Sequence, residues 1–272
     1  MSGKIRDQRI IGTLVLTALV SCLLVASTSR AGIIYSQDWE SGVDGQSILA
    51  APYSFGVGGG AGAFVVQDTT PLGTDLAVAA RNAGDGGGST GAASIGITTP
   101  SLTPSSKYIL TATVRASGAN DSFIGLSETG GFNGTGAYIG VTELPTPATW
   151  AWHLDARGIR SGILSDVVVL GTSGQLLGTN VDLTLEFDID SNTVSAKVTD
   201  GVTTLSGSFV GGNDFSGIGY FAIQQFGAGI NVDDVLIQEV VVPEPATASL
   251  LEVGTAGLLM LGRQRRRQLY NE

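Results

Sequence analysis

The segment Val181 to Asp190 alternates strictly between apolar and polar residues, with an apolar residue at every odd position. This period of two is that of a β-strand with one buried face and one solvated face. The turn residues Asp190, Ser191 and Asn192 come next, and Thr193 to Thr199 then forms a second extended run. The pattern predicts a β-hairpin.

Similar short runs occur along much of the chain. The 40 glycines and the low charged fraction of 14% favour short strands joined by tight turns. No convincing amphipathic helix pattern separates these runs, so we predict an all-β domain, an antiparallel β-sandwich that spans residues 32–240. Further strands are expected at Tyr108–Ala116, Ser122–Ser127, Ala137–Thr142, Asp166–Leu170 (buried on both faces), Phe215–Gln224 and Ile230–Val241.

The N-terminus, residues 1–31, has the features of a secretory signal peptide. A basic start precedes an apolar run from Ile10 to Val25, and the small residues Ser29 and Ala31 predict cleavage after Ala31. An alternative is lipidation of Cys22, because Leu19 to Cys22 fits a loose lipobox. The apolar residues that continue after Cys22 argue against this alternative.

The C-terminus combines a proline motif, an apolar stretch and a basic cluster. Pro243-Glu244-Pro245 is followed by the mostly apolar segment Ala248 to Gly262. As a helix this segment would be about 22 Å long, which is short of the ~30 Å hydrocarbon core, and Glu252 within it is costly. Hydropathy alone therefore leaves a buried or interfacial helix as an alternative to a membrane span. The basic cluster consists of Arg263, Arg265, Arg266 and Arg267.

The order of these three parts resembles the PEP-CTERM sorting signal of exported bacterial proteins, here residues 241–268, with 269–272 as a tail. The resemblance implies a transmembrane sorting helix, arginines that stop transfer through the inner membrane, and cleavage near Pro243, Glu244 and Pro245 by an exosortase. Basic residues flank both apolar segments of the chain on their terminal sides. Both termini are therefore expected on the cytoplasmic side, with residues 32–240 outside.

The charge of the exported part excludes one class of partner. Between the two basic ends lie 21 acidic and only six basic residues, so this part repels nucleic-acid phosphates. The only cysteine, Cys22, lies in the signal peptide, so the domain forms no disulfide and no thiolate metal site.

The strand order resembles the concanavalin A-like or laminin-G-like jelly roll. Tyr35–Gly42 is similar to its opening strand, Leu183–Val198 to its central hairpin and Ile230–Ile237 to its closing strand. Such a fold places the first and last strands side by side, which suggests a structural calcium ion held by carboxylates of both. The alternative is that these side chains cap turns and are solvated. The four candidate ligands are Asp38, Glu40, Asp233 and Asp234.

Glu186, Asp188 and Asp190 resemble the Glu-x-Asp-x-Glu strand of laminarinase-like glycoside hydrolases, whose outer carboxylates act as nucleophile and acid. Asp190 stands where that family has a glutamate, which shortens the acid and places it at a turn. We therefore interpret the three carboxylates as a solvated strand face and expect no enzymatic activity; a glycoside hydrolase is the alternative.

Two further residue types complete the candidate sites. His153 is the only histidine, which excludes a His-rich zinc site and a Cys–His pair. Trp150 and Trp152 would share one face of an extended segment, either to stack on a carbohydrate or to pack in the core.

Together these features predict an exported protein of the cell surface or extracellular matrix with a structural or adhesive role and weak carbohydrate contact. Signal peptidase and exosortase are the expected processing enzymes, with transient attachment to the inner membrane. The sorting resemblance further implies biofilm-forming Gram-negative bacteria, with exopolysaccharide as a partner.

Overall fold

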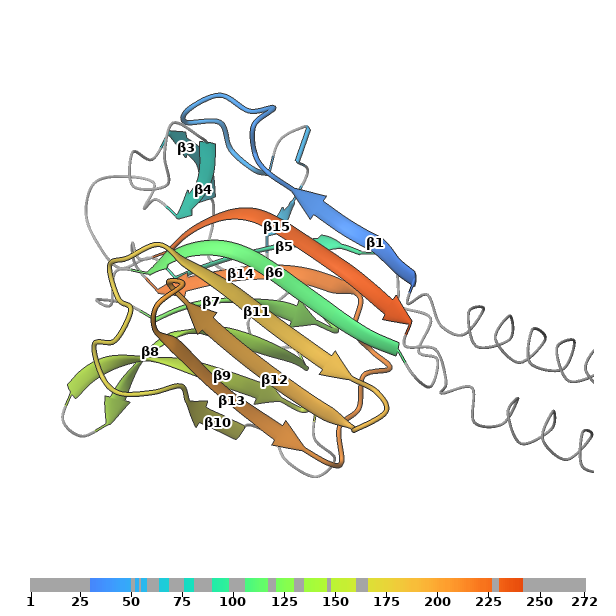
Figure 1. The fold of residues 1–272 in the computed structure, drawn as a ribbon. Coiled ribbons are helices and arrows are strands. Elements are labelled where there is room, and N and C mark those ends of the chain that lie inside the picture. The colour runs from blue at the N-terminus through green and yellow to red at the C-terminus, as the bar shows by residue number, and fades with distance from the viewer. Residues whose placement is uncertain are drawn as a thin grey trace, which may run out of the picture. The chain divides into compact units, whose positions relative to one another are not determined.

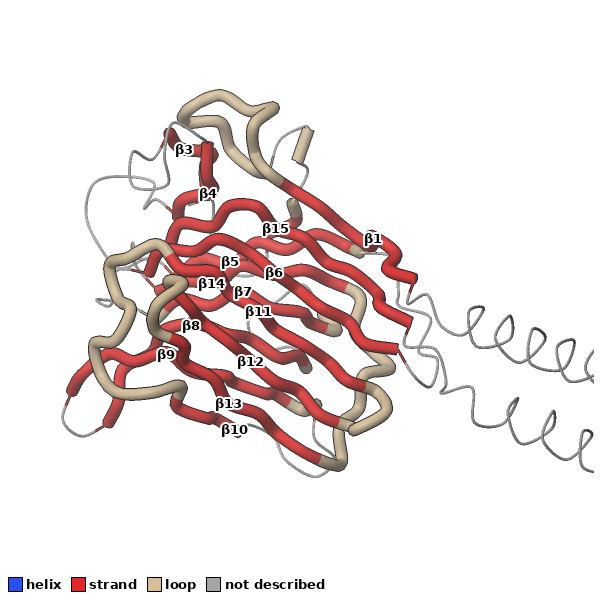
Figure 2. Tube along the Cα trace, in the orientation of Figure 1, coloured by secondary structure: helices blue, strands red, loops and turns tan. Residues whose placement is uncertain are grey.

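The described part of this computed structural model consists of fifteen β-strands and their connections (Figures 1 and 2). It covers residues 30–49, 52–53, 55–57, 64–68, 76–80, 90–97, 106–116, 121–129, 135–145, 148–159, 166–226 and 230–241. The strands are β1 Arg30–Gln37, β2 Gly56–Val57, β3 Phe64–Asp68, β4 Leu76–Ala80, β5 Thr90–Gly96, β6 Ser106–Ala116, β7 Ser122–Ser127, β8 Gly136–Pro145, β9 Ala148–Arg157, β10 Asp166–Val169, β11 Val181–Asp188, β12 Thr193–Thr199, β13 Thr204–Val210, β14 Tyr220–Phe226 and β15 Ile230–Val241.

Within these residues the strands form two sheets, which we call sheet A and sheet B. Sheet A has the order β13-β12-β11-β6-β15-β4-β3, with β1 also paired to β15, and sheet B has the order β10-β9-β8-β7-β14-β5-β2. Every pairing with a defined register is antiparallel, such as that of β11 with both β6 and β12. The predicted antiparallel β-sandwich is confirmed.

A single large apolar cluster joins the two sheets. In β11 the odd-numbered residues from Val181 to Phe187 are buried and the even-numbered residues are not, as the alternation in the sequence predicts. The same cluster contains Ile139 and Trp152 of sheet B, so one core lies between the two layers.

The first and last strands of the domain are neighbours. β1 pairs with β15, and the start of β1 and the end of β15 lie at the same end of the sandwich (Figure 1). By compactness the chain divides into Ala31–Val240, which holds the sandwich, and a second unit of Met1–Arg30 with Val241–Glu272. The predicted signal peptide, apart from the start of β1, and the predicted sorting segment after Val241 lie outside the described residues.

Among the described residues, no helix has the length and apolar character needed to cross a membrane.

Two strand expectations are corrected by the structure. The segment predicted as a strand buried on both faces, Asp166–Leu170, contains β10, an edge strand of sheet B whose Val167 and Val169 are exposed on one face. The strand expected from Phe215 begins only at Tyr220, because residues 215–219 form a turn in which Ile218 N–H bonds to Phe215 C=O. Apolar residues alone do not distinguish a buried strand from a buried turn.

The inward face of β11 gives a direct test of the core. We expect Leu185→Ala to lower the free energy of unfolding by about 2–5 kcal/mol, because Leu185 is fully buried and a cavity would remain. Thr184→Ala, one residue away on the outer face, is the control and is expected to cost less than about 1 kcal/mol. Urea unfolding of the mature protein measures both; equal losses would contradict the assigned faces.

Candidate functional site

The outer face of sheet B, which points away from the main core, carries buried polar side chains. On β9 these are His153 and Asp155, and on β14 the corresponding residue is Gln224, all at most 5% exposed. Their neighbours Phe123, Tyr138 and Ala222 form a small apolar cluster separate from the main one. A sheet face that turns from the core is usually solvated, so its burial together with polar groups marks it as the candidate site.

Two glycines allow the aromatic rings of this face to lie flat on the sheet. A Cβ atom on Gly125 would lie 2.8 Å from Cδ1 of Tyr138, and one on Gly140 would lie 2.7 Å from Cδ1 of Phe123. The same Cβ atoms would overlap backbone carbonyl oxygens of the neighbouring strands. Gly125 and Gly140 therefore cannot be replaced by a residue with a side chain. The ring of Tyr138 lies in the space where a side chain of Gly125 would be, and the ring of Phe123 lies in the corresponding space at Gly140.

Gln224 is the polar residue of this face that most needs an explanation. Its side chain is 1% exposed, and neither its Oε1 nor its Nε2 has a hydrogen-bond partner among the residues that the structure describes. In register it lies beside Phe123 of β7, which itself lies beside Gly140 of β8. A buried amide without protein partners costs free energy, so packing alone does not explain a glutamine at this position.

A charged group lies at the other side of the same face. Nε of Arg157 donates to Oδ2 of Asp155 over 2.8 Å, and the guanidinium lies 5.7 Å from the centre of the Tyr138 ring. Burial raises the pKa of Tyr138 and lowers the pKa of His153, whose Nδ1 lies 2.8 Å from Ala151 C=O. The face therefore presents neutral donors and acceptors, aromatic surface and one compensated ion pair.

The sequence analysis identified only His153 on this face, and only to exclude metal and nucleophilic chemistry. The signal for Gln224 is present in the sequence, because it interrupts the apolar run Tyr220 to Ile223 at a position that alternation assigns to the outer face. The glycines beside Phe123 and Tyr138 give no such signal, since cross-strand neighbours are known only once the sheet order is known.

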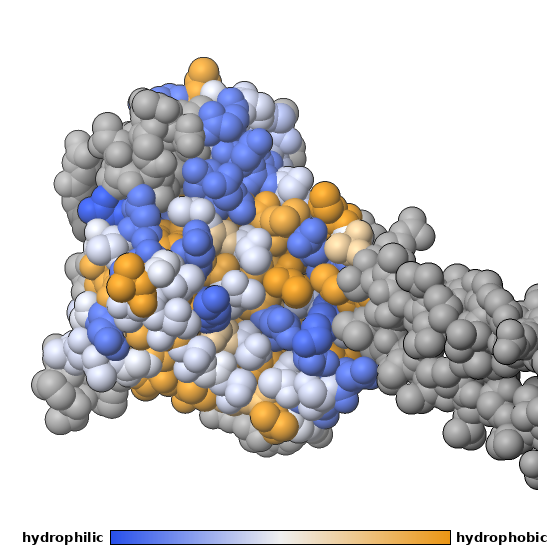
Figure 3. All heavy atoms as spheres, in the orientation of Figure 1, coloured by the Kyte–Doolittle hydropathy of each residue, from blue (hydrophilic) through white to orange (hydrophobic). Residues whose placement is uncertain are grey.

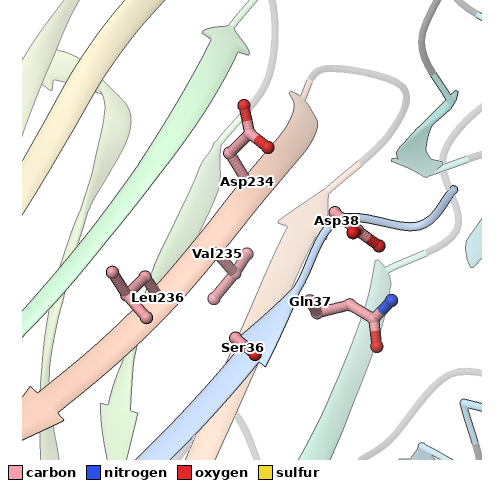
Figure 4. A pocket seen from close by; sticks show the side chains of 6 residues that line it. All are labelled: Ser36, Gln37, Asp38, Asp234, Val235 and Leu236. Atoms are coloured by element: carbon pink, nitrogen blue, oxygen red, sulfur yellow. The ribbon is translucent and has the colours of Figure 1, made fainter. Parts of the chain in front are cut away.

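A second candidate lies at the junction of β1 with β15. A pocket of about 470 Å³ is lined by Ser36, Gln37, Asp38, Asp234, Val235 and Leu236 (Figure 4). The pocket lies where the pairing partner of β15 changes from β4 to β1. β4 pairs with Asn231 and Val232, at the start of β15. The jelly-roll expectation that the first and last strands lie together agrees with this arrangement.

Two backbone irregularities flank this pocket. The burial of Val232, Asp233 and Val235 shows that the alternation of β15 shifts by one residue, and Asp234 has φ 50°, which together define a β-bulge. Just after β1, Trp39 has φ 63° and is fully buried against the rings of Tyr53 and Phe55. Such conformations are rare for residues other than glycine.

The four carboxylates predicted to bind calcium are only partly brought together. Asp38 and Asp234 line the pocket, yet their carboxylates project in different directions (Figure 4). Oδ1 of Asp38 accepts the N–H of Glu40 over 3.2 Å, and Oδ1 of the buried Asp233 accepts the N–H of Asp234 over 2.8 Å. The described residues contain no group of three or more His, Cys, Asp or Glu side chains that could hold a metal ion. The two carboxylates that line the pocket carry four oxygens, fewer than the six to eight that calcium prefers.

The two tryptophans proposed for carbohydrate stacking lie in β9 and share its inward face. Trp152 is fully buried in the main core, and its Nε1 lies 3.4 Å from Leu176 C=O, to which it donates. Trp150 is partly buried against the same core. Of the two interpretations left open by the sequence, the structure places Trp152 in core packing between the two sheets.

The carboxylates that resemble a hydrolase strand are held by one lysine on the outer face of sheet A. Nζ of Lys107 lies 2.9 Å from Oε1 of Glu186 and 2.9 Å from Oδ2 of Asp188. These hydrogen bonds raise the pKa of Lys107 to about 12. Asp190 lies beyond β11, in the exposed turn between β11 and β12.

The processing residues fall at or beyond the ends of the domain. Ala31 is the second residue of β1, so cleavage after it would leave Gly32–Gln37 of that strand. Pro243, Glu244, Pro245 and the four arginines of the C-terminal cluster lie outside the described residues.

Comparison with known proteins gives similarities of fold. No family model and no curated protein matches the chain. Among solved structures, the CBM2 module of the evolved Dit of Lactobacillus casei phage J-1 is 12% identical, covers 80% of this chain and 100% of its own, and has a TM-score of 0.49. The metal-free Emp46p carbohydrate recognition domain is 10% identical, with 75% and 95% covered and a TM-score of 0.47. Peanut lectin is 12% identical, with 80% and 100% covered and a TM-score of 0.45. At this level of identity and superposition, the likenesses carry no information on ligand or activity.

The lysine on sheet A gives a pH-dependent prediction. Burial acts to raise the pKa of Asp188, but hydrogen bonds from Lys107 and Ser191 outweigh it and hold the pKa below its usual value. The stabilisation is therefore complete above the ordinary aspartate pKa of about 3.9 and is lost as the pH falls through the lower folded-state value. We expect Lys107→Met to be less stable than wild type at pH 7, with the difference shrinking at pH 3.

The measurement is urea unfolding at both pH values, with Lys197→Met, an exposed lysine on β12, as the control. A difference between wild type and Lys107→Met that is the same at pH 7 and pH 3 would contradict the assignment of Asp188.

Proposed function

We propose that this chain is an exported protein of the cell surface or extracellular matrix, processed at both ends, with an adhesive or structural role. The observation that carries the proposal is the position of the chain ends in the sandwich. β1 begins and β15 ends at the same end of the sandwich (Figure 1), so the points where the leader and the tail join the domain are close together. Both segments can therefore enter the same membrane without unfolding any strand.

The charges of the two ends support the same proposal. The N-terminal apolar run is preceded by basic residues, and the C-terminal run is followed by four arginines, so both flanks favour the cytoplasmic side. We propose that the tail is a PEP-CTERM-type signal cut by an exosortase near Pro243, Glu244 and Pro245. Cleavage there would remove nothing from β15, which ends at Val241.

The sorting proposal predicts the ends of the mature protein. Intact-mass spectrometry of the protein recovered from the envelope or medium of its host is expected to show a chain that begins at Gly32 and ends close to Pro243. Replacing Arg263, Arg265, Arg266 and Arg267 by glutamine is expected to abolish the C-terminal cut, because the tail no longer stops in the membrane. Replacing the same four by lysine keeps the charge and is expected to preserve it.

An intact chain that still ends at Glu272 and is found in the cytosol would contradict the proposal. Equal processing of the glutamine and lysine variants would remove the stop-transfer role of the arginines while leaving export itself in place.

For the adhesive role we propose that the outer face of sheet B binds a neutral carbohydrate. The unpartnered amide of Gln224 offers one acceptor and two donors, which is the chemistry that pairs with sugar hydroxyl groups. Phe123 beside it in register supplies an apolar ring surface. Because the amide is buried, a hydrogen bond to it is stronger than one at an exposed site. Access requires this face to open, so slow association is expected.

A non-catalytic role accords with the carboxylates. Glu186 and Asp188 both form ion pairs with Lys107, so the charge of both carboxylates is compensated by one cation. We therefore propose no hydrolase activity for this strand.

A single substitution distinguishes the proposed binding role of Gln224 from its effect on stability. Gln224→Leu is expected to raise the free energy of unfolding by about 1 kcal/mol, because it removes an unsatisfied buried amide. The same change is expected to weaken retention on a neutral β-glucan by at least about fivefold, the value of one lost hydrogen bond. Affinity electrophoresis and urea unfolding of the mature protein give the two readouts.

The control is Gln238→Leu on β15, a half-buried glutamine on the other sheet, which is expected to change neither property by much. Unchanged β-glucan binding by Gln224→Leu, or no binding by the wild type, would refute a carbohydrate site at this face.

A further inference from the structure

Among the described residues, β13 is the terminal strand of sheet A. All seven of its residues pair with β12, from Thr204 opposite Thr199 to Val210 opposite Thr193, and it is the terminal strand in the sheet order. Its side chains alternate between exposed and buried, with only Gly207 intermediate. Among the described residues, no strand pairs with its other side. One backbone row of N–H and C=O groups along β13 therefore has no strand partner there.

This edge lacks the features by which edge strands usually avoid pairing. The sequence Thr204 to Val210 contains no charged residue and no proline. Its register with β12 is continuous, so no bulge interrupts it. Soluble proteins commonly protect such an edge with lysine, proline, a bulge or a covering segment. An edge that is flat, uncharged and seven residues long is suited to receive another strand.

The residue order of β13 is complementary to itself when two copies run antiparallel about Gly207. Ser206 of one copy then lies opposite Ser208 of the other, Leu205 opposite Phe209, and Thr204 opposite Val210. The first pair joins two small polar residues on the outer face, and the second joins two apolar residues on the core face. No like charges meet anywhere along the seven positions.

The central glycine fits the axis of such a pairing. A Cβ atom on Gly207 would lie 2.6 Å from Cδ2 of Leu170 and 2.7 Å from Cγ1 of Val168, so sheet B packs closely behind this point. The space on the core side is thereby filled by sheet B of the same copy. A second copy that pairs with β13 therefore approaches along the strand edge.

Exposed apolar side chains gather at the same edge of the sandwich. Of the eight large apolar residues that are exposed among the described ones, four lie on or next to β10 and β13, which contact each other. Figure 3 shows apolar atoms among polar ones along this edge. Val202, at 93% exposure, lies in the turn before β13. The four are Val167, Val169, Val202 and Val210.

From these observations we propose that the open edge of β13 pairs with the same edge of a second copy of this chain, antiparallel and centred on Gly207. The two copies share a two-fold axis and join their A sheets into one continuous sheet. β13 is about 23 Å long, so the surface area buried between the two copies lies at the low end of specific interfaces. We therefore expect the dimer to be weak in dilute solution. Many copies held at one surface raise its occupancy. The inference is independent of the carbohydrate site and of the sorting signal.

Disulfide trapping tests both the contact and its register. Ser206→Cys and Ser208→Cys are made separately in a chain that also carries Cys22→Ser, and the mature proteins are oxidised alone and as an equal mixture. In the proposed pairing, position 206 of one copy lies opposite position 208 of the other, and the Cα atoms of opposite residues are within disulfide range. Position 206 of one copy and position 206 of the other are instead diagonal neighbours about 7–8 Å apart, and the same holds for position 208. The mixture is therefore expected to give at least about tenfold more covalent dimer than either variant alone.

A charge pair on the same edge provides the matched control. The double variant Ser206→Asp with Ser208→Asp places like charges opposite each other and is expected to abolish the dimer in sedimentation at high concentration. Ser206→Asp with Ser208→Lys places opposite charges together and is expected to retain it. The proposal is overturned if the mixture crosslinks no better than the single variants, if the aspartate pair leaves the dimer intact, or if the wild type remains monomeric and pairs only with another protein.

Discussion

Sheet A depends on the pairing of its last strand with strands from the beginning and the middle of the chain. β15 contacts β6 on one side and β4 and β1 on the other, so the sheet is divided until residues 230–241 are in place. Contacts between distant parts of a chain carry a high entropic cost and form late in folding. The sandwich is therefore completed only when the end of the domain is available, which for an exported chain means after nearly all of it has crossed the membrane.

The change of partner along β15 also accounts for the bulge at Asp233 and Asp234 and for the pocket beside it.

The outer face of sheet B is organised differently from that of sheet A. On sheet A the outward residues of β11 are polar, and Lys107 compensates the carboxylates there. On sheet B aromatic rings lie over glycines, and the polar groups between them are buried, including an amide without partners. The first arrangement contributes to stability, whereas the second opposes it. The unsatisfied amide on the outer face of sheet B is the reason that we place the proposed binding surface there and not on sheet A.

The strands with strict alternation or clear turn residues were predictable from the sequence. β7, β12 and β15 have the expected bounds, and β11 has the expected buried face. β9 and β13 were not predicted, because their sequences mix small, polar and aromatic residues whose burial depends on neighbouring strands. For the candidate site, the proximity of Asp38 to Asp234 followed from the jelly-roll resemblance, whereas the environment of Gln224 did not. Rings that fill the space above glycines are a property of register, and register is fixed by the whole sheet.

The neighbouring positions of β1 and β15 also determine how the domain responds to force. A pull between the two ends of the chain would separate antiparallel neighbours from one end, so their hydrogen bonds would break one after another. A pull through the C-terminus against a contact elsewhere on the sandwich would instead load β15 along its length between β6 and β1. All the hydrogen bonds of that strand then share the load, and rupture requires many to break together. A domain that is held at its C-terminal side and loaded through a contact elsewhere on the sandwich is thus pulled in its mechanically stronger direction.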